Sequence, residues 1–248
     1  MRTSNPALND RFLSGLGGYV SSDESMTVQG TVNKAAILIL CALVTSGWLW
    51  IKFFQSPNPA TVTPWMIGGA IGGLVVALVT VFKMSWAPVT APLYSLLEGL
   101  VIGGLSALAE MQFPGIVLQA VLGTFGTFLA MLAAYSSGIV KATEKFKLGV
   151  MAATGGIAVV YLISLVFNLF GASVPYIHGS GLIGIGFSLV VVTIAALNLV
   201  LDFDFIDNGV RQGAPKYMEW YAAFGLMVTL IWLYIEVLRL LIKLRSRD

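Results

Sequence analysis

Charged side chains are scarce in this sequence. Only 10% of its 248 residues are Asp, Glu, Lys or Arg, and the formal net charge is +2. An ordinary soluble domain carries roughly a quarter charged residues, and it needs a wettable exterior that this composition does not supply. The small net charge also gives no indication of nucleic-acid binding.

Cysteine and histidine are nearly absent. Cys41 alone cannot form an internal disulfide or a Cys-rich metal site, and His178, the single histidine, argues against zinc. Ser180 follows His178 by two residues but lacks the Gly-x-Ser-Gly pattern of intramembrane serine proteases. The sequence also lacks a phosphate loop and a dinucleotide fingerprint. We therefore expect no enzyme and no bound cofactor.

The N-terminal segment lacks the basic start and adjoining apolar stretch of a signal peptide. Residues 1–33 are instead predicted to be a polar tail. Residues 34–244 are predicted to form the transmembrane domain, and residues 245–248 a short basic tail.

Long apolar windows are what the sequence has in abundance, and 57% of the residues are hydrophobic. A transmembrane helix needs about 20 mostly apolar residues. The windows lack the alternation of a barrel wall, so we predict an all-α membrane protein of seven transmembrane helices. Pro64 suits the first turn of the second helix. The predicted spans are 35–54, 65–82, 93–109, 114–136, 148–170, 181–201 (extending to 206) and 218–244.

The distribution of Lys and Arg predicts the orientation. Seven spans place nine basic residues of the N-terminal segment and three loops on one side, and Lys52 with the basic C-terminal residues on the other. The loop charges favour a cytoplasmic N-terminus, whereas the basic C-terminal tail favours the opposite orientation unless the last helix is re-entrant or shorter. Short loops and the missing targeting signal suit a bacterial inner membrane.

Small residues recur at helix-packing intervals. Lipid does not drive helices together, so close helix contacts need small side chains. Packing inside the bundle and homodimerisation both fit this pattern, and the oligomeric state stays open. The candidate packing residues are Gly68, Gly69, Gly72, Gly73, Gly99 and Gly103.

Acidic residues within or beside the spans are the candidate functional groups, because a charge in hydrocarbon is costly. Glu98 lies inside the third span, and the others lie near the ends of the sixth and seventh. Ion pairing at helix ends is the structural alternative, and Glu236 has Arg239 and Lys243 nearby for this purpose. The gating or ion-binding candidates are Asp202, Asp204, Asp207, Glu98, Glu219 and Glu236.

Four segments carry a resemblance to a known family. They are residues 96–104 (LLEGLVIGG), 167–170 (FNLF), 201–206 (LDFDFI) and 238–241 (LRLL). Their order and the seven-span count resemble the Bax inhibitor-1-like family, in a divergent bacterial branch. The resemblance covers residues 34–244.

The resemblance implies a last helix surrounded by six others. It also implies a calcium leak gated by protonation of two facing aspartates on the last two spans, with calcium as the transported ion. Asp202 matches the first of these aspartates and is the candidate calcium ligand, but the position of the second falls on Thr229. Glu98, Glu219 or Glu236 is then left to supply the other carboxylate, and Asp204 to assist from the same helix as Asp202.

Two other functions stay open from the sequence. One is an interaction protein that binds a membrane protease or stress factor without carrying ions. The other is a secondary transporter of a small substrate, although no internal repeat of the kind found in such transporters is evident.

Overall fold

Seven long helices make up the computed structural model, which describes residues 25–170, 179 and 181–247. All seven are long and apolar enough to span a membrane, which confirms the predicted all-α class. Most of the expected N-terminal tail, and both His178 and Ser180, lie outside the described residues. The elements are α2 (Val28–Gln55), α3 (Pro59–Phe82), the 3-10 helix η2 (Met84–Trp86), α4 (Ala87–Gln112), α5 (Ile116–Ser136), α6 (Glu144–Leu169), α8 (Leu182–Arg211) and α9 (Met218–Arg245).

Capping side chains set where the helices begin. Thr27 caps α2 by accepting a hydrogen bond from the Gly30 N–H at 2.9 Å, so the helix begins seven residues before the expected Ala35. Asn58 caps α3 in the same way, and Pro59 occupies its first turn. The expectation that Pro64 opens this helix was therefore wrong, because Pro64 lies inside it.

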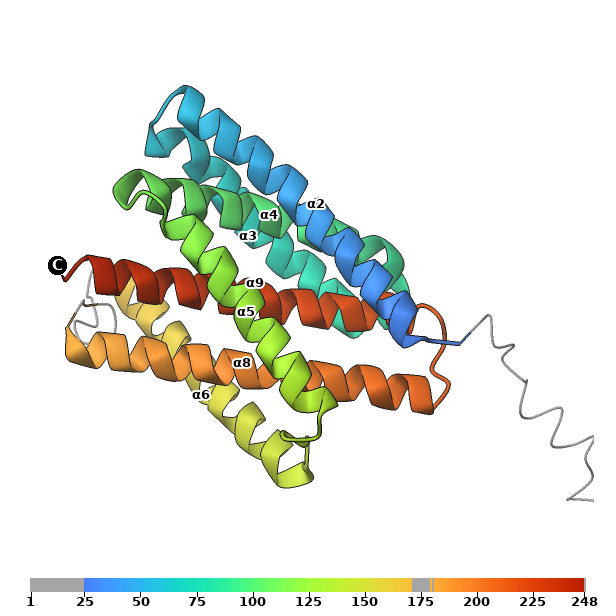
Figure 1. Cartoon of the computed structure of the whole chain (residues 1–248). Coiled ribbons are helices and arrows are strands. Elements are labelled where there is room, and N and C mark those ends of the chain that lie inside the picture. Colours follow the sequence, from blue (N-terminus) through green and yellow to red (C-terminus); the bar gives the residue numbers. More distant parts are fainter. Residues whose placement is uncertain (1–24, 171–178, 180, 248) are drawn as a thin grey trace, which may run out of the picture.

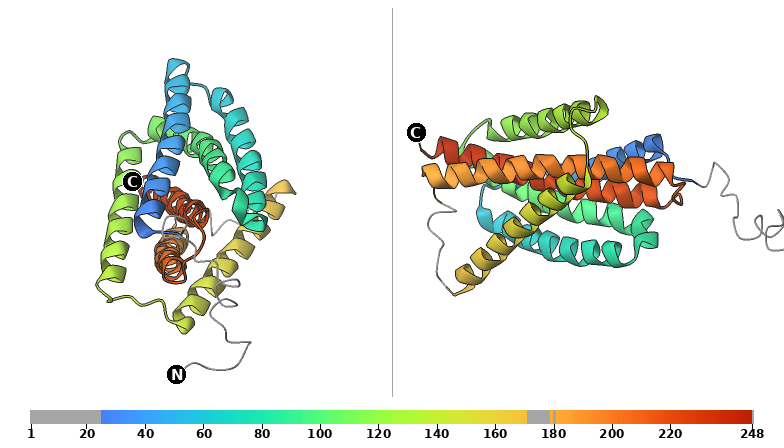
Figure 2. Two further views of the ribbon diagram at one scale, coloured as in Figure 1. Left: turned by 90° about the vertical axis from the view of Figure 1, so that its right-hand side faces the viewer. Right: turned by 90° about the horizontal axis from the view of Figure 1, so that it is seen from below.

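The last helix lies at the centre of the bundle. α9 packs against α2, α4, α5 and α8, and it is the most buried of the seven helices. Figure 1 and Figure 2 show α9 beside the antiparallel α8, with the other helices around the pair. This arrangement confirms the prediction of a central last helix.

Glycines bring α4 close to the two helices beside it. On α3, a Cβ atom at Gly69 would lie 2.6 Å from the Leu97 carbonyl oxygen. On α4, a Cβ at Gly103 would lie 2.6 Å from Ser46 Cα of α2, and one at Gly99 would overlap the same helix. Gly72 and Gly73 of α3 likewise face α4 side chains, whereas Gly68 faces open space. Five of the six candidate glycines thus pack inside the bundle.

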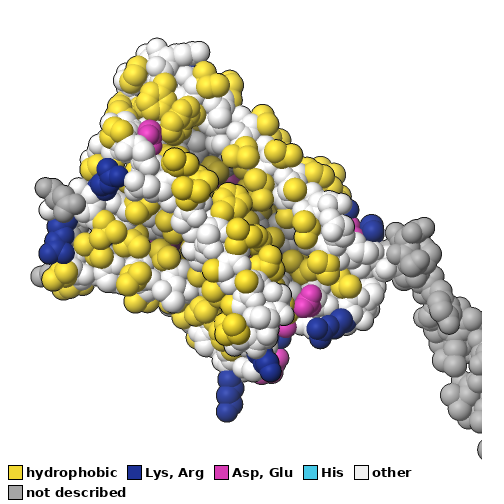
Figure 3. Space-filling model, in the orientation of Figure 1, with side chains coloured by type: hydrophobic (Ala, Val, Ile, Leu, Met, Phe, Trp, Pro, Cys, Tyr) yellow, Lys and Arg dark blue, Asp and Glu magenta, His cyan; other side chains and the backbone are white. Residues whose placement is uncertain are grey.

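Apolar side chains cover the outer surface along the middle of the helices. On the face shown in Figure 3, hydrophobic side chains dominate the centre and Lys and Arg gather toward the ends. The helix α6 packs chiefly on α8 and crosses the bundle at a wide angle (Figure 2). The fold thus presents an apolar belt to lipid and places most charges at its two rims.

Candidate functional site

An acidic cavity lies between α3, α4, α8 and α9. Its volume is about 750 Å³. Two candidate carboxylates from distant parts of the sequence, Glu98 of α4 and Asp202 of α8, share its lining. Apolar side chains and the rings of Tyr94, Phe205, Tyr221 and Phe224 form most of the remaining wall.

Asp202 points its carboxyl group toward α9. Its Oδ2 atom is buried and has no hydrogen-bond partner among the described residues. The Thr229 hydroxyl of α9 lies within hydrogen-bonding reach of this carboxyl group, and it also bonds to the Gly225 carbonyl oxygen at 3.3 Å. Asp202 therefore faces a hydroxyl group, and a second aspartate is missing at this contact.

Glu98 of α4 lies against Gly73 of α3. A Cβ atom added at Gly73 would lie 2.7 Å from Glu98 Oε1, so a glycine there leaves room for the carboxylate. Glu98 lies eleven residues after Ala87, and Asp202 nine before Arg211. At 1.5 Å per residue both are about 14–17 Å inside the same rim of the bundle, which is near the middle of a hydrocarbon core about 30 Å thick.

The other two aspartates of α8 have partners. Asp204 pairs with Lys147 of α6 at 2.8 Å and accepts a hydrogen bond from the Asn208 amide at 2.8 Å. Asp207 accepts a hydrogen bond from the Tyr135 hydroxyl of α5 at 2.9 Å. These contacts join the end of α8 to the neighbouring helices, so they explain both residues structurally.

Glu219 is a fully buried carboxylate with two lysine partners. Lys34 lies 2.5 Å from one oxygen and Lys216 lies 3.2 Å from the other. The backbone N–H and the hydroxyl of Thr27 also donate to Glu219, at 3.0 and 2.9 Å. The carboxylate thereby joins the start of α9 to the start of α2.

Glu236 belongs to a buried network at the other end of α9. Its Oε1 atom accepts hydrogen bonds from the Tyr161 hydroxyl of α6 and from Arg239, both at 2.8 Å. Arg239 also donates to the Tyr161 hydroxyl oxygen at 2.7 Å. Lys243, one turn further along, donates to the Gly184 carbonyl and to Ser188 of α8. Ion pairing thus accounts for Glu236, although its Oε2 atom has no hydrogen-bond partner among the described residues.

Several functional neighbours were not predicted from the sequence. Tyr135, Tyr161 and Lys147 are partners of candidate carboxylates, but each comes from a helix remote in sequence. A tyrosine inside an apolar span is a weak signal, since such residues also pack as simple hydrophobes. Within the described ranges, no three His, Cys, Asp or Glu side chains cluster as a metal site would require.

Comparison with known proteins identifies the chain. A family model described as Bax inhibitor 1 like matches residues 5–246, nearly the whole sequence. No curated protein and no solved structure matches it significantly. This nearly full-length match, together with seven apolar helices of which the last is central, shows that this multi-pass membrane protein belongs to the Bax inhibitor 1-like family.

Proposed function

We propose that this protein is a pH-sensitive calcium leak channel whose cation path runs through the acidic cavity. The observation that carries the proposal is that Glu98 and Asp202 line one cavity at mid-membrane depth. Neither carboxylate forms an ion pair with a described residue, whereas the four other candidates have charged or hydrogen-bonding partners. Ionisable groups inside a membrane are costly, and those that line a cavity typically mark an ion pathway.

The chemistry of the two side chains suits a hard divalent cation. Calcium binds carboxylate and hydroxyl oxygen atoms, and the cavity offers two carboxyl groups with Thr229 beside one of them. Two carboxylates are fewer ligands than a tight calcium site needs. A weak site is what permeation requires, because an ion must leave as readily as it enters.

Thr229 changes how protonation can act in this chain. A hydroxyl group can donate to an ionised carboxylate and accept from a protonated one. The pair Asp202–Thr229 is therefore compatible with both protonation states, and ionisation of Asp202 does not push α8 away from α9 as a second carboxylate would. Protonation acts instead on the charge of the cavity, so calcium flux is expected to rise with pH as the carboxyl groups ionise.

Calcium flux into dye-loaded liposomes, measured from pH 5 to 8, tests the proposal. Asp202→Asn and Glu98→Gln should each lower flux at the upper end of this range by at least about tenfold, because a lost carboxylate removes more than about 1.4 kcal/mol of attraction for the cation. Asp207→Asn is the matched control, since Asp207 lies on the same helix outside the cavity. Absence of flux at any pH, or equal loss in the control, would overturn the channel and favour a role in binding a membrane partner.

We also propose a bacterial cytoplasmic membrane with the N-terminus in the cytoplasm. The rim that contains the start of α2 also contains the loop between α5 and α6, with Lys141, and the first turn of α6, with Lys145 and Lys147. Basic loops of this kind stay on the cytoplasmic side. A reporter fused at the C-terminus that is active only outside the cytoplasm should be active, and an inactive one would reverse the orientation.

A further inference from the structure

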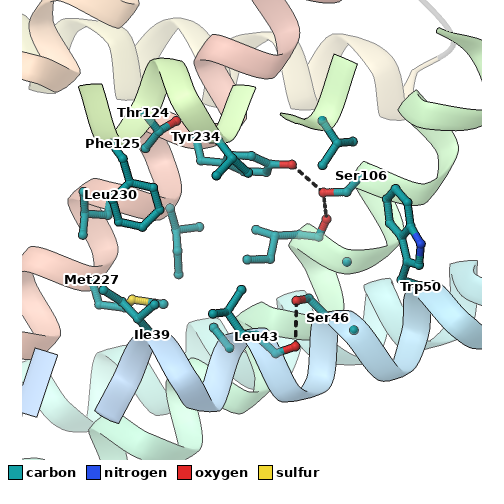
Figure 4. A pocket seen from close by; sticks show the side chains of 17 residues that line it. Ile39, Leu43, Ser46, Trp50, Ser106, Thr124, Phe125, Met227, Leu230 and Tyr234 are labelled. Atoms are coloured by element: carbon teal, nitrogen blue, oxygen red, sulfur yellow. Dashed lines mark hydrogen bonds between the residues drawn. The ribbon is translucent and has the colours of Figure 1, made fainter. Parts of the chain in front are cut away.

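A second, apolar pocket lies on the opposite side of α9 from the acidic cavity. Its volume is about 370 Å³, and it lies between α2, α4, α5 and α9. Figure 4 shows Leu43 and Ser46 of α2, Phe125 of α5 and Leu230 of α9 around it. No charged side chain is among the residues that line it, so a cation has nothing to bind there.

The hydroxyl groups around this pocket already have partners. Ser106 and Tyr234 share a hydrogen bond of 2.6 Å at one end, and Ser106 also donates to the Ile102 carbonyl (Figure 4). The hydroxyls of Ser46 and Thr124 donate to carbonyls of their own helices, at 3.2 and 2.8 Å. An occupant therefore needs no hydrogen bond, and water, which needs two to four polar partners, is not favoured.

The pocket opens toward the bilayer. Its walls α2 and α5 both pack on α4 and α9 but scarcely touch each other. Leu43 on α2 and Phe125 on α5 are 56% and 43% exposed, and between them Gly47 contributes no side chain. The opening extends to Trp50 near the end of α2 and to Val117 at the start of α5, so it belongs to the leaflet at that rim.

We propose that this pocket binds one acyl chain of a membrane phospholipid from that leaflet. Side chains that line an empty pocket lose dispersion contacts on that side. The lipid hydrocarbon at the opening is the material available to restore these contacts. A helix from a second copy fits poorly in a pocket of about 370 Å³. One helical turn, about 10 Å across and 5.4 Å long, already occupies roughly 400 Å³. An extended chain is thin enough to enter between α2 and α5.

Two matched glycine substitutions distinguish this site from general lipid contact. A Cβ atom at Gly47 meets nothing within 4 Å and Gly47 lines the pocket, so Gly47→Phe fills it. Gly68 of α3 also meets nothing within 4 Å but lies outside the pocket, so Gly68→Phe adds the same ring to the lipid-facing surface elsewhere.

The experiment uses the purified full-length protein in liposomes with a phospholipid that carries a photoreactive diazirine in its acyl chain. We expect labelled peptides to concentrate at Leu43, Val121 and Phe125. Gly47→Phe should lower labelling there by about tenfold, equivalent to about 1.4 kcal/mol, and Gly68→Phe should leave it unchanged. Leu43→Trp, which narrows the opening from α2, provides a second variant if Gly47→Phe does not fold.

Even labelling over all outward helix faces, or labelling unaffected by both pocket variants, would overturn the proposal. Crosslinks that join α2 or α5 of two protein copies would also overturn it, because a second copy would then cover the opening. Lipid labelling is read without any ion flux, so its outcome is independent of the channel proposal.

Discussion

The acidic residues that form ion pairs differ from those in the acidic cavity in what surrounds them. Glu219, Asp204 and Glu236 each face Lys or Arg within 3.2 Å. Glu98 and Asp202 have no such counter-charge among the described residues, and they share a cavity. A carboxylate with a cationic partner has a structural reason to be present. A carboxylate at mid-membrane depth without a cationic partner has no such structural role. This difference distinguishes the carboxylates that join helices from the two that line the candidate ion path.

Removal of the Glu219 charge should have the largest effect on stability. Glu219→Gln removes the buried charge that Lys34, Lys216 and Thr27 donate to, and the loss of hydrogen bonds to a charged group costs about 3 kcal/mol. The midpoint of thermal unfolding in detergent, followed by tryptophan fluorescence, should fall clearly. Glu144→Gln is the control, because Glu144 is 87% exposed and its pair should contribute under about 1 kcal/mol. Equal decreases in the unfolding midpoint of the two variants would show that burial does not make the Glu219 ion pairs more stabilising than the exposed Glu144 pair.

The close contact between α2 and α4 should be the next most sensitive feature. Gly103→Val puts a branched side chain where Ser46 Cα and carbonyl oxygen would lie 2.6 and 2.8 Å from its Cβ. Forcing the helices apart costs about 1–3 kcal/mol, measured as a lower unfolding midpoint. Gly68→Val, at an open site, should be nearly neutral. A neutral Gly103→Val would mean that the two helices do not need this contact.

A second carboxylate beside Asp202 should make stability depend more steeply on pH. In Thr229→Asp the folded protein can keep one shared proton near neutral pH, where the unfolded chain has already released it. Because the folded state then binds more protons, its stability should fall as pH rises, by at most about 1.4 kcal/mol per pH unit. Thr229→Val adds no second carboxylate, so Asp202 titrates alone and the slope between pH 6 and 8 should be clearly shallower than in Thr229→Asp. A Thr229→Asp profile no steeper than that of Thr229→Val would mean that the two side chains do not meet.

The seven spans could be predicted from the sequence because each long apolar window has only one way to satisfy its backbone in lipid. The starts of helices were less accurate. Val28 begins α2 because the polar side chain of Thr27 caps it, and hydropathy does not register a cap. Pro64 was misplaced for the same reason, since Asn58 and Pro59 begin α3 first.

Partners of the candidate carboxylates were harder to predict. The pair Glu236–Arg239 lies three residues apart on one helix and was foreseen as an option. Glu219 and Lys34 are 185 residues apart in the sequence, and only the packing of α2 on α9 brings them together. The shared cavity of Glu98 and Asp202 likewise depends on the arrangement of four helices, which no local pattern contains.

Two neutralising substitutions on α8 provide the finest test of the difference between the ion-paired carboxylates and those in the acidic cavity. Asp204→Asn removes the charge that pairs with Lys147 at 2.8 Å, where both side chains are about a quarter exposed. The cost should be about 1 kcal/mol or less. Asp202→Asn, two residues earlier, removes a charge whose Oδ2 atom has no partner, so its stability should stay within about 0.5 kcal/mol of the parent or rise slightly. Paired unfolding midpoints at pH 7.5 in one detergent measure the difference. If Asp202→Asn proves the more destabilising of the two, Asp202 stabilises the fold, and the division between structural and ion-path carboxylates does not hold on α8.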